Sequence, residues 1–133
     1  MRTGDKTPRA VLIVEDHQDV RTTLAWFLRV EGFRVATAAD GREALDVLRE
    51  GPLPDLIVLD LRMPVMDGWE FLACKRRDAR LTRIPVVVCS GKGEGLDRSS
   101  FPDVMGYKNK PANPVELVCL LRSVLDVTAA YTV

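Results

Sequence analysis

The chain has few cysteines and no long apolar segment. Its three cysteines, Cys74, Cys89 and Cys119, are widely spaced and form no Cys-x-x-Cys pair, so neither a disulfide framework nor a zinc site is predicted. The longest apolar runs are far shorter than a bilayer span, and the polar first nine residues lack the apolar core of a signal peptide. We therefore expect a protein of the reducing cytoplasm that does not bind membranes.

An excess of charge of either sign is also missing. Nineteen Lys and Arg side chains balance nineteen Asp and Glu side chains, so there is no general positive field that would hold a polyanion. Direct binding to nucleic acid is not expected. What is present is an ordinary globular composition, with 47% hydrophobic and 29% charged residues in a chain of 133. This predicts one compact domain with a packed core.

Short apolar runs of strand length alternate with longer stretches of helical periodicity. The five runs are residues 10–14, 33–38, 56–59, 85–89 and 104–107. Such alternation predicts an α/β fold in which helices surround a parallel sheet. Residues 91–103 are rich in Gly and Ser and have little apolar periodicity, so the fourth helix should be short or irregular. We expect the domain at residues 9–127, between a flexible start at 1–8 and a loose tail at 128–133.

The helical stretches carry end signals and apolar stripes. Asp40 and Asn113 are predicted N-caps. The predicted buried stripes are Val20, Leu24, Phe27 and Leu28 in the first helix and Val115, Val118, Leu121 and Leu125 in the last. In the helix that follows Gly68, a run of basic residues, Lys75, Arg76 and Arg77, is assigned to a solvated face.

Charged and hydroxyl side chains stand where the predicted strands end. They are Glu15 and Asp16 after the first strand, Asp60 after the third, Ser90 after the fourth and Lys110 beyond the fifth. Ligands of an open α/β sheet bind at the carboxyl ends of its strands, so we expect these side chains in one pocket. Three gathered carboxylates repel one another unless a cation offsets them. A hard, oxygen-seeking divalent ion such as Mg²⁺ is therefore predicted.

The same residue types suit phosphoryl transfer. Mg²⁺ commonly binds a few carboxylates together with a substrate phosphate. The ammonium of Lys110 and the hydroxyl of Ser90 could take the remaining phosphate oxygens and spread the charge that develops. Since a carboxylate can accept a phosphoryl group as an acyl phosphate, Asp60 is the predicted nucleophile.

Four motifs in order resemble the receiver family of two-component signalling. They are the acidic pair Glu15-Asp16, the stretch from Asp55 to Gly68, the strand from Ile84 to Ser90, and Lys110-Pro111. The resemblance extends from about Arg9 to Leu125. It implies a flavodoxin-like fold, a doubly wound sheet of five parallel strands in the order 2-1-3-4-5 with flanking helices.

The resemblance also implies a role for each site residue. Asp60 would be the phosphoacceptor, and Lys110 would pair with the phosphoryl group. Ser90 would be the switch hydroxyl and Tyr107 a rotating aromatic. The metal ligands would be Glu15, Asp16, Asp60 and the main-chain carbonyl of Arg62. Pro111 would fix its loop, with a cis Lys110-Pro111 bond as one way of doing so. Movement of the hydroxyl and the aromatic would reshape the face made by the fourth helix, fifth strand and last helix.

The implied partners are proteins. A histidine kinase or phosphotransfer protein would supply the phosphoryl group, and an unidentified downstream protein would read the signal. A homodimer through the face of the fourth helix, fifth strand and last helix is a further implied contact. We expect a stand-alone regulator with no external product, rather than an enzyme; a receiver excised from a longer protein is the alternative.

Residues 91–106 depart most from the family pattern, and they keep alternatives open. Gly91 follows the switch hydroxyl, and Met105 and Gly106 precede Tyr107 in place of acidic residues. Tyr107 could therefore be an ordinary core or surface residue. The second functional hypothesis is a receiver-like interaction or dimerisation module that needs no phosphate.

Other readings of the acidic motifs are weaker. Glu15 in place of Asp is a mild departure, because a longer carboxylate still reaches the metal or its water. A phosphatase of the haloacid dehalogenase kind would need an Asp where Arg62 stands, and acidic residues after the first strand would repel a flavin phosphate. His17 is expected to lie exposed at the start of the first helix, with metal ligation as its second interpretation.

Overall fold

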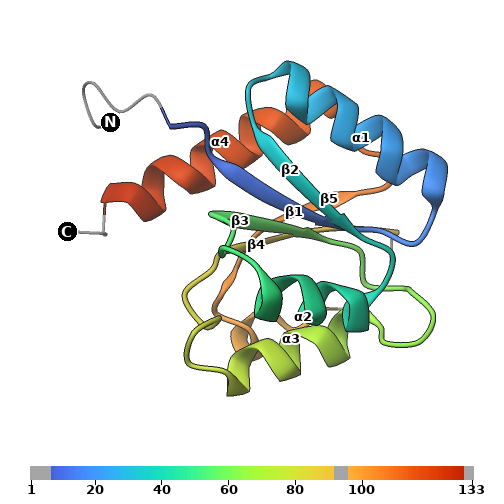
Figure 1. The fold of residues 1–133 in the computed structure, drawn as a ribbon, viewed down its shortest axis with the longest axis vertical. Coiled ribbons are helices and arrows are strands. Elements are labelled where there is room, and N and C mark those ends of the chain that lie inside the picture. Colours follow the sequence, from blue (N-terminus) through green and yellow to red (C-terminus); the bar gives the residue numbers. More distant parts are fainter. Residues whose placement is uncertain (1–6, 92–95, 131–133) are drawn as a thin grey trace.

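The computed structural model describes residues 7–91 and 96–130. Strands and helices alternate along the chain (Figure 1). In order they are β1 (Ala10–Val14), α1 (Gln18–Val30), β2 (Arg34–Ala38), α2 (Gly41–Glu50), β3 (Leu56–Leu59), α3 (Gly68–Arg77), β4 (Val86–Ser90), a 3₁₀ helix η1 (Arg98–Ser100), β5 (Val104–Asn109) and α4 (Pro114–Ala130). No helix of this described part is both long and apolar enough to cross a membrane.

All five strands are parallel and form one sheet in the order β2-β1-β3-β4-β5. The register pairs Val14 of β1 with Ala38 on one side and with Leu59 on the other. The strands therefore end together, and the residues that follow β1 and β3 are neighbours. The predicted fold class and strand order are confirmed.

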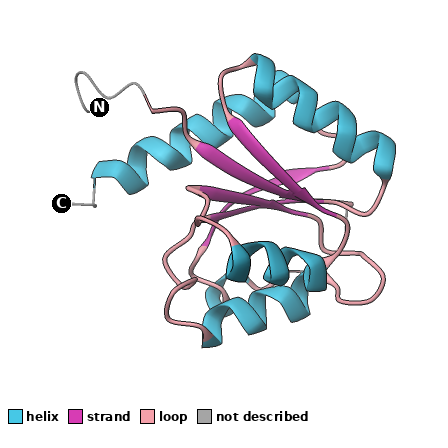
Figure 2. Cartoon of the chain, viewed as in Figure 1, coloured by secondary structure: helices cyan, strands magenta, loops and turns pink. Residues whose placement is uncertain are grey.

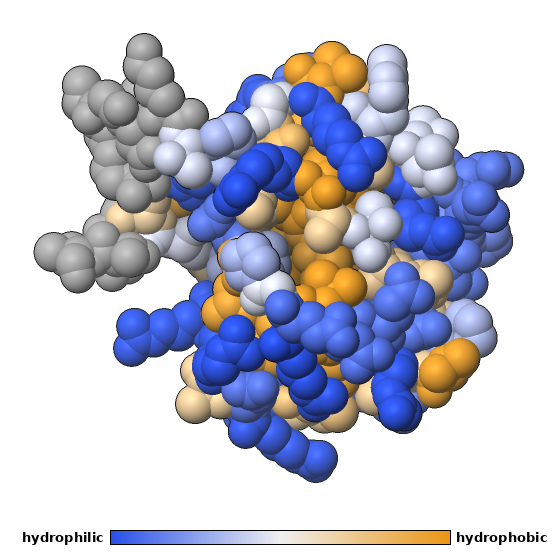
Figure 3. Space-filling model, in the orientation of Figure 1, coloured by the Kyte–Doolittle hydropathy of each residue, from blue (hydrophilic) through white to orange (hydrophobic). Residues whose placement is uncertain are grey.

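Helices cover both faces of the sheet, with α1 and α4 on one side and α2 and α3 on the other (Figures 1 and 2). Alternate residues of β1 supply the two cores: Leu12 and Val14 pack with α2 and α3, whereas Val11 and Ile13 pack with α1 and α4. This is why the strand is apolar throughout rather than at every second position. Apolar residues lie between hydrophilic outer layers in the space-filling view (Figure 3).

The helices begin at the predicted capping residues, but two residues predicted to be buried are exposed. Asp40 accepts a hydrogen bond from the Glu43 N–H at 2.8 Å, and Asn113 accepts from the first turn of α4, so both predicted caps are confirmed. Val20 and Val115, however, are 45% and 62% exposed. Both lie in the first turn of their helix, where the predicted stripe has not yet reached the sheet.

The C-terminal segment of the chain is more regular than predicted. The tail predicted to be loose at residues 128–133 is helical as far as Ala130, because α4 continues the periodicity that buries Val124 and Leu125. Residues 131–133 lie outside the described part. So do residues 1–6 of the predicted flexible start, which leaves the domain limits of 9 and 127 as predictions.

Between β4 and β5 the described chain contains a single turn of 3₁₀ helix, η1. Asp97 holds this turn by accepting hydrogen bonds from the hydroxyls of Ser99 and Ser100, at 2.6 and 2.9 Å. Residues 92–95, which belong to the same predicted helix, lie outside the described residues. The expectation of a short or irregular fourth helix is met here, and the last helix of the sequence pattern is α4.

Lys75 is not on a solvated face, and this prediction was wrong. Its side chain is fully buried and its ammonium pairs with Asp103 Oδ2 at 2.5 Å. Lys75 follows Phe71 by four residues, so it lies on the buried stripe of α3. The neighbouring Arg76 donates a hydrogen bond to the Ser100 carbonyl. We call these two contacts, Lys75 with Asp103 and Arg76 with Ser100, the α3 clamp.

Candidate functional site

Asp60 lies directly after β3 at the carboxyl edge of the sheet, and both of its carboxylate oxygens are engaged. Oδ1 accepts hydrogen bonds from Ser90 Oγ at 3.2 Å and from the Arg62 N–H at 3.3 Å. Oδ2 accepts from Lys110 Nζ at 3.1 Å. The Asp60 side chain is only 7% exposed. The predicted trio of Asp60, Ser90 and Lys110 is therefore brought together in one buried cluster.

Lys110 bridges the two sides of this cluster. Its ammonium also contacts Glu15 Oε1 at 2.5 Å, and its N–H donates to the Ser90 carbonyl at 2.8 Å. The Lys110–Pro111 peptide bond is cis, as the resemblance allowed. Burial lowers the pKa of Lys110, but the hydrogen bond to Glu15 and the charges of Asp60 and Glu15 outweigh it, so the pKa is raised overall. Lys110 thus remains a cation at neutral pH.

The acidic pair follows β1 on the other side of Asp60. The Glu15 N–H donates to the Ala38 carbonyl at 3.0 Å, which extends the pairing of β1 with β2 by one residue. The guanidinium of Arg21 donates to the Glu15 and Asp16 carbonyls at 2.8 and 3.3 Å. Arg21 was not singled out from the sequence, because its contacts are to backbone atoms and give no motif.

The donor set fits a hard divalent cation. Asp16 Oδ1 is buried and has no hydrogen-bond partner among the described residues. A carboxylate oxygen in that condition is costly unless a cation satisfies it. With Glu15 and Asp60 nearby, the pocket offers carboxylate oxygens, which are the ligands that Mg²⁺ prefers.

A shallow hollow of about 350 Å³ opens at the same edge, lined by residues of the β3–α3 loop and by Asp16. The guanidinium of Arg62 lies over the Trp69 ring, 5.8 Å from its centroid, within this hollow. Asp67 is occupied as the N-cap of α3, where it forms a reciprocal capping box with Glu70. The hollow therefore gives access to Asp16 from solvent.

Gly68 is a site residue that sequence reasoning treated only as part of a motif. A Cβ at this position would lie 2.6 Å from the Asp60 carbonyl oxygen and 2.7 Å from Leu61 Cα. The Gly68 N–H donates to the Leu61 carbonyl at 2.8 Å. The start of α3 thus lies directly against the backbone that carries Asp60, and only glycine leaves room for it.

Tyr107 lies at the margin of the site. Its hydroxyl donates to the Gly91 carbonyl at 3.3 Å, one residue beyond Ser90, and its ring packs against the core on the α2 and α3 side. Ser90 itself is fully buried. The two predicted switch residues are therefore joined through the end of β4.

A larger cavity, of about 670 Å³, adjoins the site between α1, the Lys110 loop and the start of α4. Asp60, Lys110, Cys89 and Val20 are among the residues that line it. Burial is the main cause that raises the pKa of the Cys89 thiol to about 11. Cys89 is accordingly protonated at neutral pH and is a poor nucleophile.

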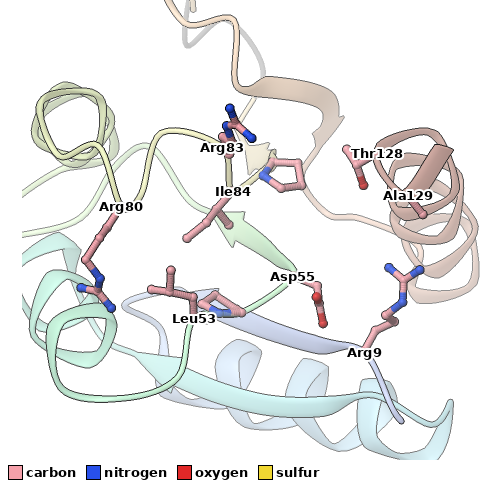
Figure 4. Close-up of a pocket in the computed structure, with 10 residues that line it drawn as sticks. Arg9, Leu53, Asp55, Arg80, Arg83, Ile84, Thr128 and Ala129 are labelled. Atoms are coloured by element: carbon pink, nitrogen blue, oxygen red, sulfur yellow. The ribbon is translucent and has the colours of Figure 1, made fainter. Parts of the chain in front are cut away.

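The opposite end of the sheet has a different character. A cavity of about 430 Å³ is lined there by residues that precede β1, β3 and β4. Arg9, Arg80 and Arg83 lie well apart around it and do not converge on one point (Figure 4). Asp55 in the same wall accepts a hydrogen bond from the Ala10 N–H at 2.8 Å. Convergent ionisable groups therefore mark the carboxyl end of the sheet as the candidate site.

Comparison with known proteins identifies the family of this chain. The family model described as "Response regulator receiver domain" matches residues 11–122. The transcriptional regulatory protein PrrA of Mycobacterium tuberculosis is 41% identical over 127 residues, covering 94% of this chain and 53% of that protein. Response regulator Rre1 of Synechocystis sp. is 36% identical over 126 residues, with coverages of 89% and 52%. The chain thus spans about half the length of these curated relatives.

Solved structures share the fold over nearly their whole length. Chemotaxis response regulator CheY4 of Vibrio cholerae has a TM-score of 0.76 at 31% identity, covering 89% of this chain and 99% of that one. The receiver domain of sensor histidine kinase PA1611 from Pseudomonas aeruginosa, which has a magnesium ion coordinated in its active site cleft, has a TM-score of 0.78 at 27% identity, with coverages of 90% and 99%. The chain therefore belongs to the response regulator receiver domain family, whose members are phosphoacceptor signalling modules rather than conventional enzymes.

Proposed function

We propose that this receiver domain accepts a phosphoryl group on Asp60 from a histidine kinase or phosphotransfer protein, in a Mg²⁺-dependent reaction, and passes the signal on through altered protein contacts. The arrangement around Asp60 carries the proposal. Its carboxylate is 7% exposed and contacts a hydroxyl on one oxygen and an ammonium on the other, at 3.2 and 3.1 Å. Both partners are groups that also bind phosphate oxygens.

In the proposed transfer, a carboxylate oxygen of Asp60 bonds to phosphorus while the phosphorus–nitrogen bond of the donor phosphohistidine breaks. The product is an acyl phosphate, and the neutral imidazole of the donor leaves. Lys110 and Ser90 would exchange their contacts with Asp60 for contacts with the phosphoryl oxygens, stabilising the charge that develops there. Neither residue has far to move, since both already touch the carboxylate.

Glu15, Asp16, Asp60 and the main-chain carbonyl of Arg62 would hold the divalent ion, Glu15 chiefly through water. The buried, unpartnered Oδ1 of Asp16 supports this assignment. When bound, the ion would neutralise negative charge on the phosphoryl oxygens and on the carboxylates, which otherwise repel the incoming group.

The signal would leave the site through Ser90. If its hydroxyl turns from Asp60 to a phosphoryl oxygen, the backbone of the neighbouring Gly91 would shift with it. The Gly91 carbonyl accepts the Tyr107 hydrogen bond at 3.3 Å, so Tyr107 would respond to that shift. Tyr107 belongs to β5, so its reorientation would alter the surface of β5 and of the segment before it. A downstream protein, or a second copy of the chain, would bind one form of this surface better than the other.

One observation favours the alternative, a module that acts without phosphate. The α3 clamp ties Ser100 and Asp103 to α3 through a buried ion pair and a hydrogen bond. These residues lie in the segment whose rearrangement the switch would require. A rigid segment would suit constitutive binding of a partner better than switching.

The test is intact-mass measurement after incubation with Mg²⁺ and acetyl phosphate. The native protein should gain one phosphoryl group, and chelation of the metal should prevent the gain. Asp60→Asn should gain none, whereas Asp46→Asn, a matched change at an exposed position of α2, should behave as the native protein does. Failure of the native protein to gain mass with Mg²⁺ bound would favour the phosphate-independent module.

A further inference from the structure

His17 stands beside the acidic pair with an imidazole that does not cap its helix. It occupies the N-cap position of α1, yet its side chain makes no capping hydrogen bond. The side chain is 73% exposed, and its Nδ1 atom lies 3.5 Å from Glu15 Oε2 and 3.6 Å from Asp16 Oδ1. The His17 N–H donates to the same Glu15 oxygen at 3.0 Å. The backbone therefore keeps the imidazole at the rim of the acidic pocket.

These three side chains lie close enough together to reach one ion. One ligand atom from each of Glu15, Asp16 and His17 lies within 4.8 Å of the others. In an octahedral site with bonds of about 2.1 Å, neighbouring ligands are about 3.0 Å apart and opposite ones about 4.2 Å apart. The distances from Nδ1 to the two carboxylate oxygens are 3.5 and 3.6 Å, so each pair would have to close by roughly 0.5 Å to become neighbouring ligands. Small side-chain shifts would complete the set.

Hydrogen bonding explains the arrangement less well. N–H···O hydrogen bonds usually span about 2.7–3.2 Å, and both distances from Nδ1 are longer than that. A cation would also satisfy the Asp16 Oδ1 atom, which is buried without a hydrogen-bond partner in the described part of the chain although the Asp16 side chain as a whole is 27% exposed. The imidazole nitrogen and this unsatisfied oxygen are 3.6 Å apart.

We propose that His17 Nδ1 is a ligand of the divalent ion at this pocket, and that the pocket consequently takes Co²⁺, Ni²⁺ or Zn²⁺ more tightly than Mg²⁺. Imidazole nitrogen suits these ions, whereas Mg²⁺ prefers oxygen ligands and keeps its waters. Because both kinds of ion would use Asp16 and Glu15, only one binds at a time. The inference rests on the proposed function for the position of the ion, and adds to it a ligand and an ion class.

Pulsed electron paramagnetic resonance of the Mn²⁺-loaded protein tests the ligand directly. His17 is the only histidine in the chain, so in tag-free protein an imidazole ¹⁴N modulation can arise only from this residue. The native protein should show the modulation. His17→Gln, which keeps a polar side chain at an exposed position, should bind Mn²⁺ and lack it.

Calorimetric titration with Ni²⁺ and with Mg²⁺ tests the ion class. His17→Gln should lose Ni²⁺ affinity by on the order of tenfold or more, while its Mg²⁺ affinity stays within about twofold of the native value. Asp16→Asn should weaken the binding of both ions, which shows that they share a pocket. Far-UV circular dichroism of each variant checks that the fold is kept.

Two outcomes would overturn the inference: bound Mn²⁺ without ¹⁴N modulation in the native protein, or equal Ni²⁺ affinity in native and His17→Gln protein. Failure of the proposed function looks different. If acetyl phosphate and Mg²⁺ leave Asp60 unmodified while the ¹⁴N modulation is present, the phosphoacceptor role fails and His17 is still supported as a ligand.

Discussion

Two lysines of this receiver domain each lie 2.5 Å from a carboxylate oxygen, but one side chain is partly exposed and the other is fully buried. Lys110 lies 2.5 Å from Glu15 and 3.1 Å from Asp60 and is 27% exposed, and its pKa is raised. Lys75 lies 2.5 Å from Asp103 alone and is fully buried. Burial lowers the pKa of Lys75 more than the hydrogen bond and charge of Asp103 raise it.

The difference lies in the charge balance of the two clusters. Around Lys110, two carboxylates exceed one ammonium, and Asp16 adds to the excess close by. That excess of negative charge suits the metal ion that we propose for this cluster. Lys75 and Asp103 balance each other, so nothing further is needed, and the pair serves to hold the segment before β5 against α3. The same two residue types thus make a reactive pocket in one place and a structural tie in the other.

The largest effect should come from leaving Lys75 without its carboxylate. Asp103→Ala should lower the free energy of unfolding by about 3–5 kcal/mol, because an unpaired charge stays buried. Without Asp103 the pKa of Lys75 should fall further below its ordinary value, so the loss should shrink as pH rises from that lower pKa toward the native one, because the buried amine of the variant is then neutral. Urea unfolding across pH measures both.

The matched control for that change removes the whole pair. Lys75→Met combined with Asp103→Leu replaces the pair by apolar side chains and should cost much less than Asp103→Ala alone. An equal loss of unfolding free energy in the two proteins would mean that the unpaired buried charge is not the cause of the destabilisation.

Removal of Lys110 should be milder, because this group is partly solvated. Lys110→Met should cost about 1.5–3 kcal/mol near pH 7, and should tighten Mg²⁺ binding since the ammonium no longer competes for the carboxylates. The folded pKa of Lys110 is raised, so its stabilisation is complete below the ordinary lysine pKa and is lost as pH rises through the folded value.

Lys108→Met is the control for this second experiment. Lys108 pairs at 3.3 Å with Glu116, whose side chain is 65% exposed, so its loss should cost about 0–1 kcal/mol. Unfolding of the three proteins in urea from pH 7 to pH 11 gives the comparison. A cost for Lys110→Met no greater than that for Lys108→Met would contradict the role given to the site lysine.

A third change should lower the pKa of Lys110 by leaving it, like Lys75, with a single carboxylate partner. In Glu15→Gln, Lys110 keeps only Asp60 as a charged partner, so the pKa of Lys110 should fall because its burial is less fully opposed. Titration of the Lys110 Nζ resonance by ¹⁵N NMR measures the change. Glu43→Gln, at an exposed position of α2, should leave the titration of Lys110 unaltered, and an unaltered pKa in Glu15→Gln as well would refute the argument from charge balance.

The smallest effect concerns the exposed half of the α3 clamp. Arg76→Gln removes the hydrogen bond to the Ser100 carbonyl at the surface and should change the free energy of unfolding by only about 0.5 kcal/mol. Arg77→Gln, one residue along the same helix, serves as its control. A loss of several kcal/mol in Arg76→Gln would show that the clamp depends on Arg76 rather than on the buried Lys75.

Much of the fold and of the candidate pocket could be predicted from the sequence, because both follow from simple periodicities. Apolar runs alternating with helical stretches predict the parallel sheet, and a parallel sheet brings its strand ends to one edge. The sequence alone therefore predicts that Asp60, Ser90 and Lys110 lie together. Their mutual contacts agree with that reasoning.

Lys75 was missed because residue type was weighed above position. A lysine in a basic run is usually solvated, yet this one is four residues from Phe71 and three from Leu72 on one helix face. Its partner, Asp103, is 28 residues away in an irregular segment. Periodicity within one helix could have indicated burial, but nothing local could have indicated the partner. Val20 and Val115 show the reverse error, since stripe position does not guarantee a covering surface in the first turn.

The contact at Gly68 limits which sequences can keep this site. Any side chain there would press within 2.6 Å of the Asp60 carbonyl oxygen, and a backbone atom cannot move aside without displacing the phosphoacceptor candidate. At Gly51 an added Cβ would meet only the Val47 carbonyl at 3.5 Å, an ordinary contact. In a library selected for signalling, position 51 should therefore accept a range of residues and position 68 only its glycine. The residues recovered at these two positions would then show, without a structure, which glycine lies against the backbone of Asp60.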